Sequence, residues 1–495
     1  MTYIAVVTLY VLMLLGISVY KSRTVKTDED FMVAGRDVPV YMLVATLVCT
    51  WIGSGSLFGT AGLTFRTGIS ELWFSAGAWV GILVVYTIAA RVRRIAKYTL
   101  TDLLEKRYSQ LAKVLGTITI IIAYMVIAGY QFKGGGRFIA ILSEGSITPE
   151  TGMIIAAALI IGFTVLAGMV SIVSIDIFNG SIMLLAMIVT LPFAIMGHGG
   201  IDAVVMTIQQ HQPSHLSIMG GHDFVWVVGI ALPTFLLLMS ESSMYQKFSS
   251  ADNARNAKRA VMGMFIGVVL VETLMMLIAL VGFAIYADDP RFFLADGGIN
   301  RAMAEEIILR IGFEQLPTII GSLLLAAGAA IVISTGNTFL MVTSTNVTRD
   351  IFQAFFYKNA TSSQVVWLQR ACIIGIGVLA YLMMSQFETI LEMALVSYTM
   401  IGASLAPALL AAFFWKRVTR IAGVLSIAAG MLSVITITVL NSVFRDSGTT
   451  ILGFDFPMDT DYIAIPAVII SVTTLVVVSL LTPKPLESDW REFAS

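Results

Sequence analysis

The chain has 495 residues, of which 57% are hydrophobic and only 12% are charged, and its mean hydropathy is +0.88. Soluble domains carry about 25% charged residues, so the composition excludes an ordinary soluble enzyme and indicates a polytopic membrane protein. The 30 basic residues are balanced by 31 acidic ones, so we expect no nucleic-acid partner. The two cysteines, Cys49 and Cys372, lie in apolar runs, which excludes a disulfide framework.

Thirteen apolar runs are long enough to cross a bilayer as helices, which takes about 20 residues each. They lie near 3–20, 40–64, 71–90, 114–142, 150–170, 175–197, 223–245, 260–286, 316–346, 364–384, 388–414, 421–442 and 462–482. The runs are too long and too uniformly apolar for the strands of an outer-membrane barrel. We therefore expect an all-α polytopic membrane protein with about 13 transmembrane helices.

The basic residues predict how these spans are oriented. Lys21, Arg23 and Lys26 follow the first run and no basic residue precedes it, so we expect an uncleaved helix whose amino terminus lies outside. With 13 spans, 23 of the 30 Lys and Arg residues then face the cytoplasm, Lys97 and Lys247 among them, and five face outward. This asymmetry predicts a multi-pass plasma-membrane protein, of the bacterial inner-membrane type, with a cytoplasmic carboxyl terminus.

The second span contains residues that interrupt a helix at mid-membrane depth. Gly53, Ser54, Gly55 and Ser56 follow Trp51, and glycine and serine are poor helix formers. Unwinding here would free backbone carbonyls, which inside a membrane must face a partner, water or an ion. The alternative is close helix packing through small residues.

The seventh span holds a matching interruption five spans later. Pro233 removes a backbone donor, and Glu241 is followed by Ser242 and Ser243. An intramembrane carboxylate is costly unless paired or hydrated, which predicts a functional role for Glu241. Alternatively, the helix ends earlier and Glu241 is interfacial. Matching breaks in the two halves of a transporter mark its binding site.

Polar residues in other spans are candidates for ion and solute binding. Asp176 lies at the predicted cytoplasmic start of the sixth span, and Ser334 and Thr335 lie in the ninth. Hydroxyl and carbonyl oxygens with a carboxylate nearby suit Na⁺, although such hydroxyls also bond to their own helix. Gln131 in the fourth span is placed to reach the cavity, and the glycines at 134–136 indicate close packing rather than a phosphate loop.

The sequence lacks the features of ATP-driven transporters, receptor kinases and metal-binding proteins. The longest loops, 199–222, 287–315 and 444–461, leave no room for a kinase or nucleotide-binding domain, and no Walker A motif occurs. All four histidines fall in or beside the loop 199–222, where Pro213 disfavours a regular helix, so we expect a solvated loop rather than a metal site.

Four stretches, taken in order, resemble the sodium/solute symporter family, which includes sodium–glucose and sodium–proline transporters. Residues 22–39, with Asp-Phe-Met-Val-Ala-Gly-Arg at 30–36, resemble the family's DFFLAGR loop. Residues 165–176 resemble its GGL…TD segment, with Ala-Gly-Met in place of Gly-Gly-Leu. Residues 329–350 resemble the sodium-binding helix, and 401–417 resemble the GPALLLGLFWKR segment.

The resemblance implies a LeuT-like core of two inverted five-helix repeats. The implied parts are an extra helix and cytoplasmic loop at 1–39, a first repeat (spans 2–6) at 40–198, a second repeat (spans 7–11) at 223–415, and two further helices with a short tail at 420–495. The two interruptions then open corresponding spans of the two repeats.

The family pattern also implies where ligands bind. It places sodium among the backbone oxygens of Cys49, Ile52 and Ile331 and the hydroxyls of Ser334 and Thr335, with Asp176 at the acidic position beneath them. The family's substrate-binding residues match this sequence poorly. The solute is therefore expected beside the two breaks, near Trp51, Gly53, Ser54, Ser56, Gln131, Glu241 and Ser242.

We therefore predict a sodium-coupled secondary active symporter, not an enzyme. It would import a small polar organic solute (a sugar, amino acid, carboxylate or vitamin) by alternating access, with Na⁺ as the co-transported ion and the lipid bilayer as its surroundings. One alternative is a proton-coupled carrier of the same fold, with Glu241 or Asp176 carrying the proton. Another is a membrane protein that senses a solute. The oligomeric state is not fixed by the sequence.

Overall fold

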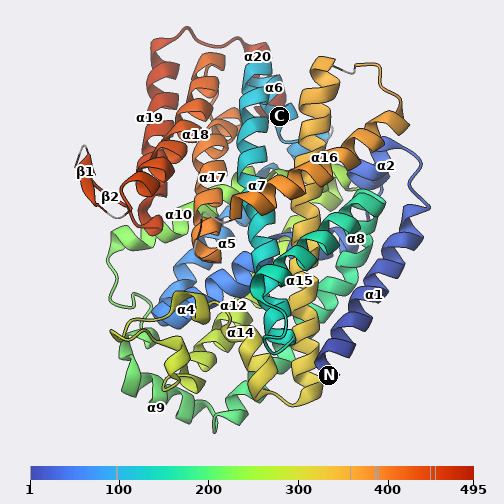
Figure 1. The fold of residues 1–495 in the computed structure, drawn as a ribbon. Coiled ribbons are helices and arrows are strands. Elements are labelled where there is room, and N and C mark those ends of the chain that lie inside the picture. Colours follow the sequence, from blue (N-terminus) through green and yellow to red (C-terminus); the bar gives the residue numbers. More distant parts are fainter. Residues whose placement is uncertain are drawn as a thin grey trace.

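The computed structural model describes residues 2–95, 99–356, 358–384, 387, 389–445, 447–451 and 453–494. Lys97, one of the predicted cytoplasmic charges, and Glu388, within the predicted eleventh span, lie outside this part. The predicted ranges contain further residues outside it, at 1, 96, 98, 357, 385, 386, 446, 452 and 495. The described chain is almost entirely helical (Figure 1), which confirms the all-α prediction.

The main bundle consists mostly of long helices, together with the shorter α4 and α11. Its helices are α1 (Thr2–Ser22), α3 (Val40–Trp51), α4 (Ala61–Thr67), α5 (Leu72–Ile95), α7 (Gln110–Leu142), α8 (Pro149–Gly197), α10 (Phe224–Ser240), α11 (Ser242–Ser250), α12 (Ala254–Ile285), α15 (Thr318–Asn346), α16 (Ser362–Met383), α17 (Ile390–Phe414), α18 (Arg420–Val443) and α19 (Ala464–Leu481).

Shorter elements cap the ends of the bundle. The short helices are α2 (Asp28–Val33), α6 (Thr101–Arg107), α9 (Ile201–His211), α13 (Arg301–Ala304), α14 (Ile307–Arg310) and α20 (Glu487–Ala494). A hairpin pairs β1 (Thr449–Ile451) with β2 (Phe454–Phe456) in antiparallel fashion.

Within the described residues, 12 helical segments are long and apolar enough to cross a membrane. The helix α8 supplies two of them, because Gly168 (φ 58°, ψ −148°) turns the chain between its arms. The sixth span therefore begins at Gly168, not near residue 175 as predicted. The predicted second span is divided into the short α3 and a segment from Gly55 that bends at Gly68 into α5. Counted as one broken span, it completes the predicted 13.

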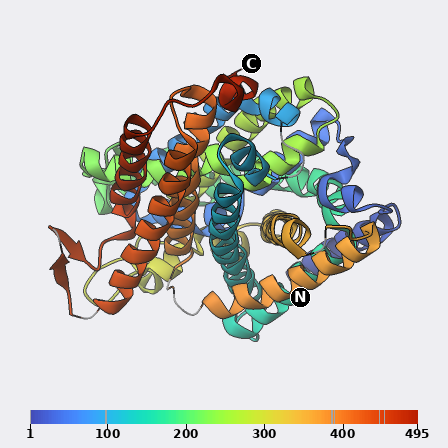
Figure 2. The same cartoon turned by 90° about the horizontal axis from the view of Figure 1, so that it is seen from above.

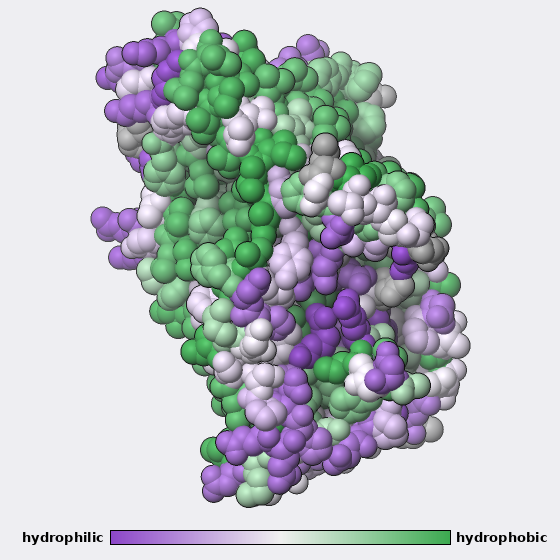
Figure 3. All heavy atoms as spheres, turned by 90° about the vertical axis from the view of Figure 1, so that its left-hand side faces the viewer, coloured by the Kyte–Doolittle hydropathy of each residue, from purple (hydrophilic) through white to green (hydrophobic). Residues whose placement is uncertain are grey.

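The two chain ends lie at opposite ends of the bundle (Figure 1), as an odd number of crossings requires. Helix α1 lies on one flank and α18 and α19 lie on the other (Figures 1 and 2). On the face drawn in Figure 3, hydrophobic side chains predominate over the upper and left-hand part, while hydrophilic ones gather at the two ends and in a patch at mid-height on the right. The hydrophobic part fits a bundle surrounded by lipid.

Two of the family-like stretches meet at Gly168. Phe31 of α2 is completely buried, and a Cβ atom added to Gly168 would lie 2.6 Å from the carbonyl oxygen of Phe31. The positive φ and this close approach both require glycine. The loop 22–39 is thereby fixed against the bend between the two arms of α8.

Candidate ion and solute site

Two helices are interrupted inside the bundle with nearly the same backbone geometry. Helix α3 ends at Trp51 and is followed by Ile52 at φ −76° and ψ 97°, before the chain resumes as a π turn from Gly55. Helix α10 ends at Ser240 and is followed by Glu241 at φ −72° and ψ 97°. The second break differs from prediction in one respect, because α10 continues unbroken past Pro233.

The first break presents its freed carbonyls to helix α15. The hydroxyl of Thr335 lies 3.0 Å from the carbonyl oxygen of Cys49 and 3.0 Å from that of Ile52. The predicted sodium oxygens of these three residues thus converge at one point, and the Thr335 hydroxyl bonds to another helix rather than to its own. Ile331, the remaining predicted backbone ligand, lies one helical turn before Thr335 on α15.

Asp176 lies directly beside these oxygens, completely buried. Its carboxylate accepts hydrogen bonds of 2.5 Å from the hydroxyls of Ser334 and Thr46. The prediction that Asp176 lies at the cytoplasmic start of its span is wrong, because the span begins at Gly168. Asp176 is consequently about two turns inside the helix, at the level of the break.

Lys247 is the main residue that the sequence analysis misplaced. It was counted among the cytoplasmic charges because the apolar run of the seventh span stops near residue 245. In the structure it lies on α11, fully buried, with its ammonium 3.8 Å from the Asp176 carboxylate. The position of Lys247, six residues after Glu241, could have indicated its burial, because the helix that resumes after the break at Glu241 carries Lys247 into the bundle.

A small cavity lies between the two breaks. It is lined by Thr50, Trp51, Tyr130, Leu237, Glu241, Met244, Thr335, Phe339 and Tyr398. Trp51 and Glu241 were predicted to lie here. The aromatic residues from the fourth, ninth and eleventh spans were missed, because aromatic side chains are common in any transmembrane helix.

Glu241 is 1% exposed and lies inside the bundle, at the break between α10 and α11. One carboxylate oxygen, Oε1, accepts hydrogen bonds from the Tyr124 hydroxyl and from the Ser243 amide and hydroxyl. The other oxygen, Oε2, has no hydrogen-bond partner among the described residues. Buried polar atoms are usually paired, so Oε2 is available to a ligand in the cavity that Glu241 lines.

Gln131 supports the first break rather than lining the cavity. Its amide oxygen accepts a 2.9 Å hydrogen bond from the backbone N–H of Ser54, and its amide nitrogen closely approaches Gly53. Ser56 and Ser242 are buried beside the breaks but do not line the cavity. The glycines at 134–136 pack closely against neighbouring segments, as predicted: a Cβ atom on the second would lie 2.5 Å from that of Ala156.

A buried carboxylate in α12 fixes the orientation of Trp51. Glu272 accepts hydrogen bonds of 2.6 Å from the indole N–H groups of Trp51 and Trp79, one to each oxygen. The ring of Trp51 also stacks on Tyr398 at 6.1 Å between centroids. Glu272 gives no signal of this role in the sequence, because no helix-breaking residue accompanies it.

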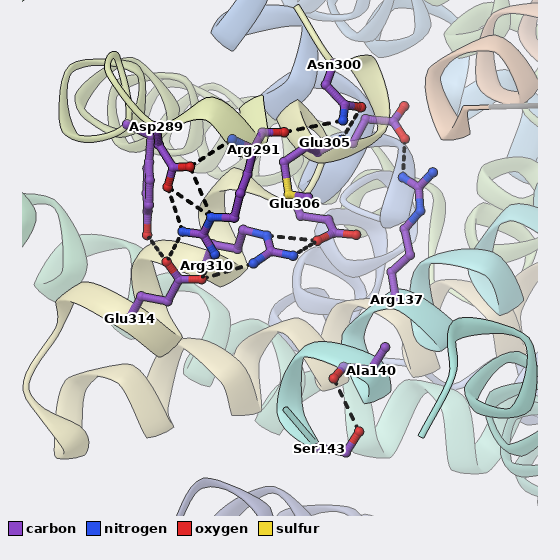
Figure 4. Close-up of polar contacts among 12 residues, drawn as sticks. Arg137, Ala140, Ser143, Asp289, Arg291, Asn300, Glu305, Glu306, Arg310 and Glu314 are labelled. Atoms are coloured by element: carbon purple, nitrogen blue, oxygen red, sulfur yellow. Dashed lines mark hydrogen bonds and ion pairs between the residues drawn. The ribbon is translucent and has the colours of Figure 1, made fainter. Parts of the chain in front are cut away.

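The end of the bundle that carries α9, α13 and α14 contains a buried ion pair. Arg137 of α7 and Glu305, directly after α13, point toward each other (Figure 4) and form a salt bridge. Glu305 also accepts hydrogen bonds of 3.1 and 2.9 Å from the N–H groups of Ile390 and Leu391 at the start of α17. A Cβ atom on Gly62 of α4 would lie 2.8 Å from Glu305 Cγ. The pair thus joins α4, α7 and α17.

A second polar cluster at this end holds the loop 286–317 together (Figure 4). Arg291 forms salt bridges of 2.7 Å with Asp289 and 2.8 Å with Glu314, and Arg310 binds Glu306 and Glu314. The hydrogen bonds from Arg291 hold the pKa of Asp289 below its usual range. These pairs are more exposed than Arg137–Glu305 and maintain the shape of the loop.

A bundle of apolar helices with two matched breaks, and with a group of buried carbonyl and hydroxyl oxygens at one of them, is typical of secondary transporters built from repeated halves. The profile of the sodium:solute symporter family matches residues 31–430. The chain belongs to this family, which confirms the family resemblance.

Individual proteins agree with this assignment. The osmoregulated proline transporter OpuE of Bacillus subtilis is 24% identical over 501 residues, covering 98% of this chain and 96% of the relative. The sodium/proline symporter of Escherichia coli is 24% identical over 483 residues, covering 95% of this chain and 91% of the relative.

Among solved structures, the outward-open, substrate-bound state of a Na⁺-coupled sialic acid symporter superposes with a TM-score of 0.78 at 16% identity, covering 98% of both chains. Mhp1, a nucleobase-cation-symport-1 family transporter in a closed conformation, gives 0.58 at 12% identity, covering 94% of this chain and 97% of that one. These similarities confirm the LeuT-like fold.

The chain is therefore a sodium-coupled symporter that moves a small-molecule solute across the plasma membrane as a multi-pass protein. Na⁺ is the co-transported ion, as predicted.

Proposed function

We propose that sodium binds at the first break, between α3 and α15. Its ligands are the carbonyl oxygens of Cys49, Ile52 and Ile331 and the hydroxyls of Ser334 and Thr335. The observation that carries this proposal is the position of the Thr335 hydroxyl, 3.0 Å from each of two carbonyls freed by the break. Carbonyl and hydroxyl oxygens suit a hard monovalent cation, and the buried Asp176 adjoins them through its hydrogen bond from Ser334.

The solute binds between the two breaks, where the cavity of about 10 Å³ has room for about one water molecule and must widen to admit it, and it donates a hydrogen bond to Glu241. A free carboxylate oxygen in a buried cavity favours a solute with an amine or hydroxyl group over an anionic one. Two relatives are named as proline transporters, so L-proline and other amino acids are the first candidates, ahead of sugars and vitamins. Trp51, held by Glu272, supplies an apolar wall for the solute.

Sodium binding would order the broken segment of α3 against α15 and thereby complete the solute site beside it. Each sodium ion that enters contributes about 2.3 kcal/mol per 100 mV of membrane potential, in addition to its concentration gradient. Release of sodium to the cytoplasm would loosen the break and free the solute. The two repeats that rock about this site are 40–198 and 223–415, flanked by the helices of 1–39 and 420–495.

The end that carries α9 and the amino terminus is external, and the carboxyl terminus is cytoplasmic. Without Lys247, the sequence count is 22 basic residues on the cytoplasmic side against five outside. This asymmetry still supports the orientation. The chain carries out transport and no chemical conversion of its solute.

The test is uptake by proteoliposomes that contain the purified protein. Solutes are first selected by a thermal-shift screen of amino acids, sugars, carboxylates and vitamins, with and without sodium. We expect a stabilising solute whose accumulation requires an inward sodium gradient at fixed pH. Accumulation driven equally well by a proton gradient without sodium would instead support the proton-coupled alternative. A changed product in the medium would indicate an enzyme.

Replacing Asp176 by asparagine should impair sodium coupling more than solute recognition. The amide keeps an acceptor for Ser334 or Thr46 but removes the negative charge beside the sodium oxygens and leaves Lys247 without its counter-charge. We expect a lower apparent sodium affinity, with solute affinity nearly restored at saturating sodium. The measurement is uptake against sodium concentration at two solute concentrations. Normal sodium dependence with altered solute preference would contradict this placement.

Breaking the Arg137–Glu305 pair should favour the outward-open state. Removing one partner of a buried ion pair leaves an uncompensated charge at a cost of about 3–5 kcal/mol, which opening to water relieves. We expect Arg137→Met to raise labelling of a Leu391→Cys variant by an impermeant external thiol reagent at least several-fold. Arg310→Met, which breaks only the more exposed pairs of the loop, is the matched control. Equal labelling of both variants would show that the pair does not control access.

A further inference from the structure

Lys247 places an ammonium group among oxygens in the interior of the bundle. Its Nζ lies 3.0 Å from the carbonyl oxygen of Thr46 and 3.4 Å from the Thr338 hydroxyl, and it donates to the Thr50 hydroxyl. The carboxylate of Asp176 lies 3.8 Å away. Both charged side chains are completely buried. Four oxygens from three separate helices, α3, α8 and α15, therefore surround one cation carried by α11.

This group of oxygens has the composition of a monovalent-cation site. One carbonyl, two hydroxyls and one carboxylate form a set of hard oxygen ligands, the type that sodium prefers. An ammonium group has three donors and no acceptor, so it satisfies such a set as a cation does. A charge buried this completely must be paired, and Asp176 is the acidic group in contact with Lys247.

The ammonium site adjoins the proposed sodium site and shares elements with it. Helix α3 supplies Thr46 and Thr50 to the ammonium, and α3 with the break that follows it supplies the carbonyls of Cys49 and Ile52 to sodium. Asp176 joins the two sites, because its Oδ1 accepts from Ser334 while its Oδ2 is the oxygen nearest Lys247. The interior thus offers two adjacent cation positions, one of which is filled by a side chain.

We infer that Lys247 is a tethered cation that fills the second of these positions, so that this transporter binds one sodium ion per chain. The inference rests on the sodium site proposed above. Without the ammonium, Asp176 would be a buried charge facing only neutral donors, and the oxygens around it would be open to a second sodium ion. Lys247 also connects the ion site to the solute site through the backbone, because α11, the helix that carries Lys247, begins directly after Glu241.

The test is equilibrium binding of ²²Na⁺ alone to the purified full-length chain in lipid nanodiscs. We expect one bound sodium per wild-type chain with a Hill coefficient near one. Lys247→Gln should bind two, with a Hill coefficient that rises toward two. The double variant Asp176→Asn/Lys247→Gln should return to one, because the charge that attracts the second ion is gone. Lys106→Gln, which removes an exposed lysine on α6, should match the wild type.

The sodium counts test the tethered-cation inference, and the Thr335→Ala variant tests the proposed sodium site. Two sodium ions bound to the wild type, or a single ion bound to folded Lys247→Gln, would overturn the tethered-cation inference; so would two ions in the double variant. If Lys247→Gln does not fold, the wild-type count alone decides. A Thr335→Ala chain that binds sodium like the wild type would reject the proposed sodium site instead, and so distinguishes the two failures.

Discussion

Thr335→Ala and Ser334→Ala are each expected to weaken sodium binding about 5- to 150-fold, which corresponds to the loss of one ligand worth about 1–3 kcal/mol. Thr335→Ala should have the larger effect, because its hydroxyl lies against both carbonyls of the break. Ser334→Ala removes a ligand and also a donor to Asp176. Alanine is well tolerated in a helix, so insertion and folding should persist. The measurement is uptake against sodium concentration.

The same helix supplies a matched control. Thr343 is buried on α15 and its hydroxyl bonds to the carbonyl oxygen of Phe339 on its own helix. Thr343→Ala should therefore leave the sodium curve unchanged. Thr335→Ser, which keeps a hydroxyl, should stay close to the wild type. If Thr335→Ala and Ser334→Ala both follow the wild-type curve, sodium does not bind at this break.

Sodium and solute binding are linked, so the two variants should also change solute uptake in a defined manner. Apparent solute affinity should fall at low sodium and recover as sodium rises, because the solute site itself is intact. A loss of solute affinity that persists at saturating sodium would indicate damage to the cavity rather than to the ion site.

The sequence predicted the parts of the site that depend on local chemistry. The break after Trp51 falls at Ile52 and Gly53, at the start of the predicted run, and Ser54, Gly55 and Ser56 already belong to the resumed helix. Glu241 marks the second break, where a carboxylate inside a membrane is costly. Pro233 was a weaker guide. Proline is tolerated within a transmembrane helix when neighbouring groups compensate for the missing donor, and α10 continues past it.

The parts that were missed depend on which helices meet in space. Lys247 and Glu272 have ordinary neighbours in sequence, and their roles appear only when α11 faces Asp176 and α12 faces Trp51. Hydropathy alone placed Lys247 outside the membrane, because an apolar run cannot reveal that a polar half-helix is buried by protein. A single sequence does not show which helix packs against α11 or α12.

Glu241→Gln should weaken solute binding while sodium binding persists. The carboxylate has one oxygen satisfied by Tyr124 and Ser243 and one oxygen free, so a solute donor would form a charge-assisted hydrogen bond with the free oxygen. Losing that bond costs about 1.5–3 kcal/mol, which lowers solute affinity about 10- to 150-fold. The measurement is solute binding at saturating sodium together with ²²Na⁺ binding. Tyr124→Phe, which removes a donor to the satisfied oxygen only, should have the smaller effect on solute. Unchanged solute affinity in a folded Glu241→Gln chain would mean that this carboxylate serves only to start α11 at the break.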